Sequence, residues 1–279
     1  MSQPAASAPT ASPDEVRRAV DDVRLWYHTI ELPHGVASPG WFDLRPILDR
    51  MPWPDVRGKR CLDVGTWDGH LAFEMERRGA SEVVAIDIPD HSMWDIPIRG
   101  RKAVSGTLDA MVGEKASGFQ TAHRLLGSAV DRRTISVYDL DPAELGTFDV
   151  VVCGSLLLHL RDPVRALEAI RSVTAGVLLN TDLMRVGTTL LHPRTPVTRL
   201  DGDPNLVQWW HSNAAAHRKM LETAGFDVVR SVRPYAIPYG DGHPPDRGLR
   251  DRVNAAVRRA LLGNDGVPHT AFLARPAAL

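Results

Sequence analysis

The sequence predicts a doubly wound α/β fold, in which a mostly parallel, seven-stranded sheet follows a small N-terminal helical cap. Short apolar runs typical of strands alternate with helical patterns over most of the chain. The strand runs are apolar on both faces, as expected for a parallel sheet that helices cover on two sides. A chain of 279 residues can bury one sizeable core and carry a small accessory segment.

Composition narrows the possible partners. The formal charge of −1 gives no electrostatic reason to expect a nucleic-acid or anionic-membrane partner. No apolar run approaches the length of a membrane-spanning helix, and residues 1–13 lack the features of a secretory signal. We expect residues 1–13 to form a disordered tail, and the chain to be cytoplasmic. Cys61 and Cys153 lie in or beside apolar runs and are expected to be buried thiols, with no disulfide and no metal site.

Residues 14–57 are predicted to form the helical cap. A helix start signal at residues 12–15 is followed by apolar side chains on one helical face, namely Val16, Val20, Val23 and Tyr27. Prolines and glycines indicate a loop at residues 33–40. Residues 42–51 then fit a second short helix.

Residues 58–279 are predicted to form the main domain. Its expected strands are residues 60–64, 82–86, 134–138, 148–153, 176–180, 227–232 and 269–274. Helical patterns separate several of them, at residues 71–78, 163–173 and 213–224. Two insertions, residues 89–133 and 184–211, follow strands two and five. Ligands bind at the carboxyl ends of strands in open α/β sheets, so these insertions are the expected substrate walls.

The clearest chemical signal is residues 62–69, Leu-Asp-Val-Gly-Thr-Trp-Asp-Gly, which end a strand and open a helix. Gly65 and Gly69 allow the backbone to approach a ligand, and Asp87 ends the second strand, where a carboxylate can bind both ribose hydroxyls. An ordinary turn with an acidic strand end is the competing interpretation. The G-x-G-x-x-G dinucleotide pattern is absent, and Asp63 suits an ammonium group better than a pyrophosphate. An amino-acid-bearing nucleoside therefore fits best.

These motifs resemble the class I S-adenosylmethionine (SAM) methyltransferases, and their order covers most of residues 58–279. Asp63-Val64-Gly65 with Gly69 matches the first motif, Asp87 the ribose acid and Tyr138-Asp139 the adenine-side acid. The resemblance implies a Rossmann-like sheet, SAM as cofactor, and a cofactor site made of Asp63, Gly65, Thr66, Gly69, Asp87, Ile88, Tyr138, Asp139, Gly154 and Ser155. Trp67 stands where the family has its second glycine, so the loop is expected to run differently there.

A finer resemblance is to the tRNA wobble-uridine carboxymethyltransferase and methyltransferase group. Residues 26–32 look like its Trp-Arg-Lys segment, and Leu158-His159 looks like its Tyr-His pair. In that group the lysine and tyrosine hold the extra carboxylate of a carboxylated cofactor, whereas His28 and Leu158 stand at these positions here. Leucine cannot bind a carboxylate, and neutral histidine is a poorer partner than lysine. We therefore expect plain methyl transfer.

Methyl transfer needs an aligned acceptor and, for a hydroxyl acceptor, a base. Histidine is the natural base, so His28 and His159 are the catalytic candidates. For each, a histidine satisfied in the core or at the surface is the competing interpretation. Trp209 and Trp210 of the second insertion either stack on the methyl acceptor or anchor the following helix. The expected substrate-binding residues are Tyr27, Trp209, Trp210 and His211.

Three functions follow from these observations. The first is a methyltransferase that acts on a small molecule, such as a secondary metabolite, at oxygen, nitrogen or activated carbon. The second is a tRNA-modifying enzyme, which would need a basic surface stripe beside the cofactor. The third is a non-catalytic cofactor-binding regulatory protein, which the unusual Trp67 allows.

Overall fold

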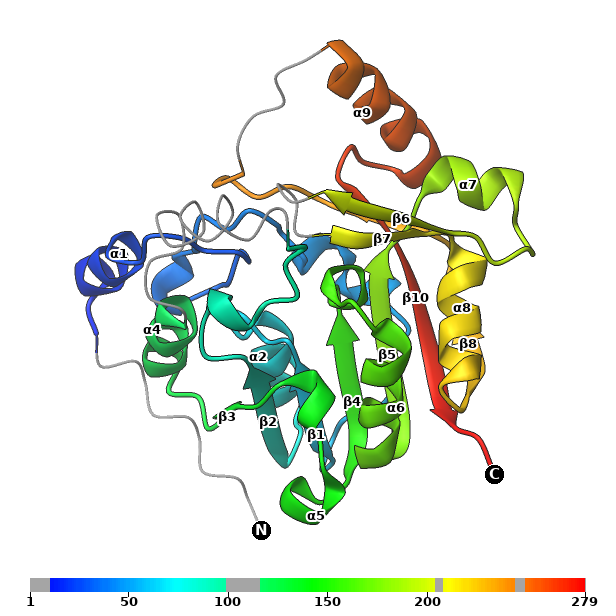
Figure 1. Ribbon diagram of the computed structural model, residues 1–279. Coiled ribbons are helices and arrows are strands. Elements are labelled where there is room, and N and C mark those ends of the chain that lie inside the picture. The colour runs from blue at the N-terminus through cyan, green and yellow to red at the C-terminus, as the bar shows by residue number, and fades with distance from the viewer. Residues whose placement is uncertain (1–10, 99–115, 204–207, 244–248, 279) are drawn as a thin grey trace.

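The computed structural model describes residues 11–98, 116–203, 208–243 and 249–278 (Figure 1). In this part of the chain an eight-stranded sheet has the order β3-β2-β1-β4-β5-β10-β8, and β9 pairs with β10. The strands are β1 (Arg60–Val64), β2 (Glu82–Asp87), β3 (Asp131–Thr134), β4 (Phe148–Gly154), β5 (Thr174–Leu183), β8 (Phe226–Ser231), β9 (Tyr235–Ile237) and β10 (Val267–Pro276).

The sheet is doubly wound and mostly parallel, as predicted. Neighbouring strands among β1 to β5 run parallel, and β10 runs antiparallel to β5, β8 and β9. Within this sheet, β9 is the strand that the sequence did not indicate. It has three residues and lies between Pro234 and Pro238, which leaves a run too short to show alternation.

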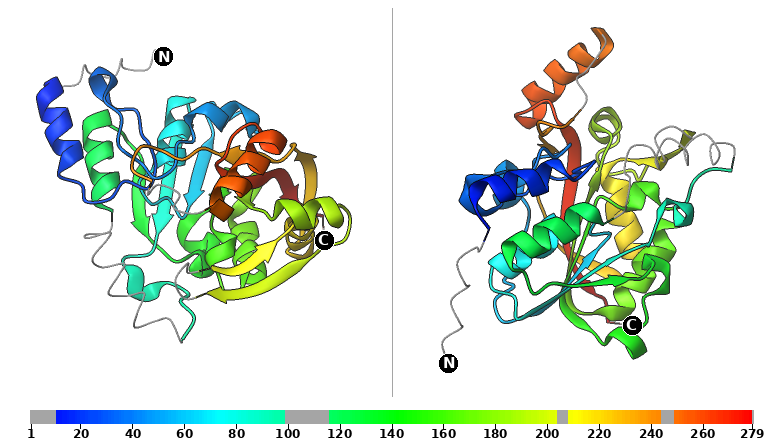
Figure 2. Two further views of the ribbon diagram at one scale, coloured as in Figure 1. Left: turned by 90° about the horizontal axis from the view of Figure 1, so that it is seen from above. Right: turned by 90° about the vertical axis from the view of Figure 1, so that its left-hand side faces the viewer.

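Helices cover both faces of the sheet (Figure 2). Apolar residues of α1 (Pro13–Asp21), α2 (His70–Arg77) and α4 (Ser117–Leu126) join one core. Those of α5 (Pro142–Leu145), α6 (Pro163–Val173) and α8 (Ala214–Thr223) join the other. Within β1, Cys61 faces the first core, whereas Leu62 and Val64 face the second. Cys61 and Cys153 are free and buried, as expected.

The N-terminal cap is less helical than predicted. Helix α1 begins with a capping box between Ser12 and Glu15 but ends at Asp21, so the prediction that Val23 and Tyr27 continue its apolar face was wrong. The Val20 carbonyl at the end of the helix accepts the Val23 N–H (3.3 Å) and the indole N–H of Trp26 (3.1 Å), and the chain turns back there. The helix predicted at residues 42–51 is a short 3₁₀ helix, η2 (Arg45–Arg50).

The third strand was also misplaced. It covers Asp131–Thr134 instead of residues 134–138, and a 3₁₀ turn, η4 (Val137–Asp139), follows it. The Ser136 hydroxyl accepts a hydrogen bond from the Tyr138 N–H (3.3 Å), which stabilises the turn in place of a strand. Tyr138 therefore lies beyond the sheet.

Of the two insertions, the second lies at the carboxyl edge of the sheet (Figure 1). The second contains α7 (Val186–Leu191) and an unpredicted hairpin of β6 (Thr198–Asp203) and β7 (Gln208–Ser212). The arrowheads of β4 and β5 point toward the top of Figure 1, where this hairpin, α7 and α9 (Leu249–Leu262) lie. The first insertion supplies α4, and its residues 99–115 lie outside the described part. The predicted tail also falls almost wholly outside it, and Pro13 is the first residue of α1.

Candidate active site

The turn after β1 is built on glycine-type backbone. Gly65 and Gly69 have φ values of 79° and 88°, in the left-handed region that favours glycine. The N–H groups of Gly65 and Thr66 both donate to the Ile86 carbonyl (3.0 Å each), which fastens the turn to the end of β2. Gly69 then opens α2. This geometry brings the backbone of the motif to the carboxyl edge, as the sequence predicts.

Two carboxylates face this turn from the same side of the sheet. Asp63 alternates with Leu62 and Val64 in β1, and Asp87 alternates with Ile86 in β2, so both acids lie on the face of the first core. Burial raises the pKa of Asp63 to about 7, and the nearby charge of Asp87 acts in the same direction. Asp63 Oδ2 is buried and has no hydrogen-bond partner among the described residues.

Asp87 also holds the turn directly. Its Oδ2 accepts the Trp67 N–H (2.9 Å) and its Oδ1 accepts the Ile88 N–H (2.8 Å). Trp67 has a φ of 47°, a left-handed conformation that costs a non-glycine residue about 1–2 kcal/mol. The tryptophan thus keeps the kind of backbone conformation that a glycine would supply. Its ring lies 4.9 Å from Tyr27 and 5.7 Å from Trp94, centroid to centroid.

Asp68 is a functional candidate that the sequence analysis missed. Its buried Oδ2 accepts the backbone N–H groups of Tyr27 (2.6 Å) and His28 (2.8 Å). Helix α4 leaves room for this carboxylate, since a Cβ on Gly118 would lie 2.6 Å from Asp68 Oδ1. Burial raises the pKa of Asp68 to about 7. The only sequence signal was an acid inside the turn, and nothing there indicated a partner 40 residues earlier.

Tyr27 and His28 therefore lie against the turn, and their roles as a substrate wall and a base stay predictions. His28 is 13% exposed, and its Nδ1 lies 4.0 Å from Asp68 Oδ2. Burial lowers the pKa of His28 well below its ordinary value, so its imidazole is neutral at pH 7. Burial likewise raises the pKa of Tyr27 to about 12, and the charges of Asp68 and Asp182 add to this effect.

The end of β4 lies next to the same turn. Val64 pairs with Cys153, so Gly65 and Gly154 leave neighbouring strands side by side. A Cβ on Gly154 would lie 2.5 Å from Thr181 Cγ2, which explains why the position has no side chain. Ser155 follows, with its hydroxyl 2.6 Å from His269 Nε2.

The 3₁₀ turn η5 (Leu157–His159) continues from there. It ends at the partly buried His159, the second catalytic candidate. Leu158 is buried in the same turn, so the chain presents no polar side chain at that position.

The adenine-side candidates lie beyond the carboxyl end of β3. The Tyr138 hydroxyl donates to Asp95 Oδ2 (2.7 Å) and accepts the Asp162 N–H (3.2 Å), and the Arg165 guanidinium lies 5.1 Å from its ring centroid. Tyr138 therefore joins the segments after β2 and β4. Asp139, at the end of η4, is exposed.

The predicted substrate-binding residues of the second insertion form hydrogen bonds with other residues of the chain. The Trp209 indole N–H donates to the Asp95 carbonyl, and that of Trp210 donates to the Leu160 carbonyl (3.0 Å). These bonds fasten β7 to its neighbours and favour the anchoring interpretation over stacking on an acceptor. His211 is buried between Arg185 and Asp201, which both contact its ring.

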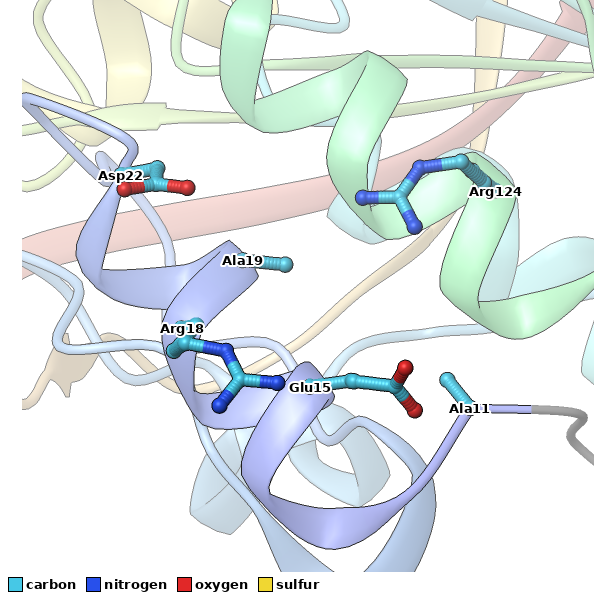
Figure 3. Close-up of a pocket in the computed structure, with 6 residues that line it drawn as sticks. All are labelled: Ala11, Glu15, Arg18, Ala19, Asp22 and Arg124. Carbon is cyan, nitrogen blue, oxygen red and sulfur yellow. The ribbon is translucent and has the colours of Figure 1, made fainter.

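Other features of the described residues do not add to the site. No group of three or more histidine, cysteine, aspartate or glutamate side chains there could hold a metal ion. No helix there is both long and apolar enough to cross a membrane. An open hollow between α1 and α4 has a mixed, charge-balanced lining: Ala11, Glu15, Arg18, Ala19, Asp22 and Arg124 (Figure 3). None of the predicted site residues lines it.

A family model described as a methyltransferase domain matches residues 42–231. The chain belongs to this family. The match begins within the N-terminal cap and runs through β8, so the methyltransferase domain includes the β1 turn, both of its acids and the end of β4.

Curated relatives of this methyltransferase are ubiquinone biosynthesis O-methyltransferases. The protein from Neisseria meningitidis serogroup C (strain 053442) is 34% identical over 115 residues, which cover 41% of this chain and 39% of the relative. The one from Burkholderia multivorans is 29% identical over 231 residues, which cover 80% of this chain and 78% of the relative. The first alignment thus spans about two fifths of the relative's length.

Solved structures support the fold. The N-terminal domain of EvdMO1 with SAH bound has a TM-score of 0.55 at 16% identity, covering 97% of this chain and 99% of that one. The same domain in the presence of SAH and D-fucose has a TM-score of 0.52 at 16% identity, with the same coverage. The finer resemblance to the tRNA wobble-uridine group finds no support in these comparisons.

Proposed function

We propose that this chain is a SAM-dependent methyltransferase that acts on a small molecule. The observation that carries the proposal is the β1 turn. It combines glycine-type backbone, an unpartnered Asp63 oxygen and Asp87 at the next strand end, within a member of the methyltransferase-domain family. SAH in the EvdMO1 structure supports the same choice of cofactor.

The residues fit this cofactor. Among the described residues Asp63 Oδ2 is a buried acceptor without a donor, and burial raises the pKa of Asp63, so this site would gain from both a hydrogen-bond donor and a positive charge. The α-ammonium group of SAM would supply both. Asp87 accepts the N–H groups of Trp67 and Ile88 and ends the second strand, where a carboxylate can also bind ribose hydroxyls. The exposed Asp139 remains our candidate for the adenine amino group.

When bound, SAM supplies an electrophilic methyl group on a sulfonium. His28 is the favoured base, because its imidazole is neutral at pH 7 and the hydrogen bond from its backbone N–H to Asp68 holds it against the turn. A neutral imidazole can accept the proton of a hydroxyl acceptor as that oxygen becomes a nucleophile. His159 is the second candidate, from the turn after β4.

A small acceptor and plain methyl transfer are supported by two observations. The relatives' names describe O-methyltransferases of ubiquinone biosynthesis. The buried Leu158 offers no hydrogen bond to the extra carboxylate of a carboxylated cofactor. Trp67 does not argue for a non-catalytic protein, because it holds a glycine-type conformation and donates its N–H to Asp87.

Transfer of a labelled methyl group tests the proposal. The protein is incubated with methyl-labelled SAM and, separately, with small phenols, amines and total tRNA. We expect label in a small hydroxyl compound and reduced transfer by H28A. Label in tRNA alone would overturn the acceptor class. Tight SAH binding with no label in any arm would favour the regulatory alternative.

A further inference from the structure

A serine at the end of β4 and a histidine in β10 form a close pair that the proposed mechanism does not use. Ser155 Oγ lies 2.6 Å from His269 Nε2, although the residues are 114 positions apart. Strand β5 connects them, because it pairs with β4 on one side and with β10 on the other. His269 is 4% exposed, and its ring stacks on Tyr235 at an interplanar angle of 21°.

The hydrogen bonds of His269 determine which nitrogen carries its proton. His269 Nδ1 lies 2.8 Å from the Val267 carbonyl oxygen, which can only accept, so Nδ1 is the N–H. Burial lowers the pKa of His269 to about 4, so the ring is neutral at pH 7 and has a single N–H. Nε2 is therefore an acceptor, and the Ser155 hydroxyl must donate to it.

Because the Ser155 hydroxyl donates to His269, it can act toward a ligand only as a hydrogen-bond acceptor. A hydroxyl has one hydrogen, and once that hydrogen is committed its oxygen can only accept. Ser155 adjoins the β1 turn, because Val64 pairs with Cys153 and a Cβ on Gly65 would lie 3.3 Å from Leu156 Cδ2. Asp63 and Asp87 supply acidic side chains to the same turn. Its side-chain groups thus suit a ligand that brings hydrogen-bond donors and positive charge.

We propose that His269 is a positioning residue that fixes the Ser155 hydroxyl as an acceptor for the α-ammonium group of the cofactor. The proposal rests on the proposed function, because it assumes a SAM-type ligand in the β1 turn. It assigns to β10 a role in cofactor selection as well as in the sheet.

The direct test uses the ligand-free protein. Nitrogen NMR of ¹⁵N-histidine-labelled protein at pH 7 distinguishes a protonated from an unprotonated ring nitrogen. We expect the His269 signal to show a protonated Nδ1 and an unprotonated Nε2, assigned by its loss in H269Q. A protonated Nε2 would overturn the proposal.

The second test measures selectivity by calorimetry with SAH and with its analogue that lacks the α-amino group. We expect S155A and H269L to reduce the preference for SAH roughly tenfold, since a hydrogen bond to a charged group is lost. The double variant should lose no more than S155A alone. H269Q, which retains an acceptor oxygen, should recover part of the preference.

H217L is the matched control. His217 is also buried and bonds a β5 carbonyl, that of Leu183 (2.8 Å), but no hydrogen bond joins it to Ser155. Its loss should lower stability and leave the preference unchanged. If H269L binds both ligands as the wild type does, or weakens both equally, this inference is wrong while the proposed function stands. Failure of the wild type to bind SAH would overturn the proposed function itself.

Discussion

Replacing Asp63 by asparagine tests whether the β1 turn holds a buried acid whose ionised form is destabilised until a cation binds beside it. The folded protein raises the pKa of Asp63 from 3.8 to about 7, so the folded state binds this proton more tightly than the unfolded state does. Stability from this residue is therefore fully present below about pH 4 and is lost as the pH rises toward 7. Between pH 5 and pH 8 the loss is on the order of 3 kcal/mol, at 1.36 kcal/mol per pKa unit.

The assay is urea unfolding of the wild type and D63N at pH 5 and pH 8. Asp68 has a similarly raised pKa but is present in both proteins, so the difference between them isolates Asp63. We expect D63N to gain stability relative to the wild type as the pH rises. We also expect SAH binding at pH 7 to release roughly half a proton from the wild type, since the pKa of Asp63 is about 7, and to release less from D63N. A difference between the two proteins that is constant with pH would refute this reasoning.

Three further changes probe the same turn. D87A removes the acceptor of the Trp67 and Ile88 N–H groups. SAH affinity measured by calorimetry should fall at least tenfold, which corresponds to the loss of roughly one hydrogen bond to a charged group. Near-unchanged affinity would contradict the ribose assignment. D68A leaves two partly buried N–H groups without this acceptor, so hydrogen exchange at Tyr27 and His28 should accelerate; unchanged protection would contradict the role of Asp68 in holding this segment. W67G relieves about 1–2 kcal/mol of backbone strain and should retain SAH binding, whereas complete loss would show that the indole is required.

The sheet and its ligand edge could be predicted because their signals are local. Apolar runs mark the parallel strands β1, β2, β4 and β5, though not the charged β3, and an acid with two glycines marks the turn between β1 and α2. The register then confirms that Asp63 and Asp87 share one face of the sheet. These features depend on side-chain alternation and on glycine backbone, both of which a single sequence displays.

What could not be predicted depends on contacts between distant segments. Asp68 bonds residues 40 positions earlier, in a stretch without helical or strand periodicity, and His269 meets Ser155 only because β5 lies between their strands. Trp210 is a residue of the type that lines aromatic ligand sites, yet its indole N–H donates to a backbone carbonyl. The type of residue was visible in each case, and the partner was not.

Isothermal titration of the wild type with SAH and, separately, with a nicotinamide dinucleotide shows which class of nucleoside the β1 turn binds. We expect saturable binding of SAH that D87A weakens, and no binding of the dinucleotide. Binding of the dinucleotide without binding of SAH would contradict this expectation.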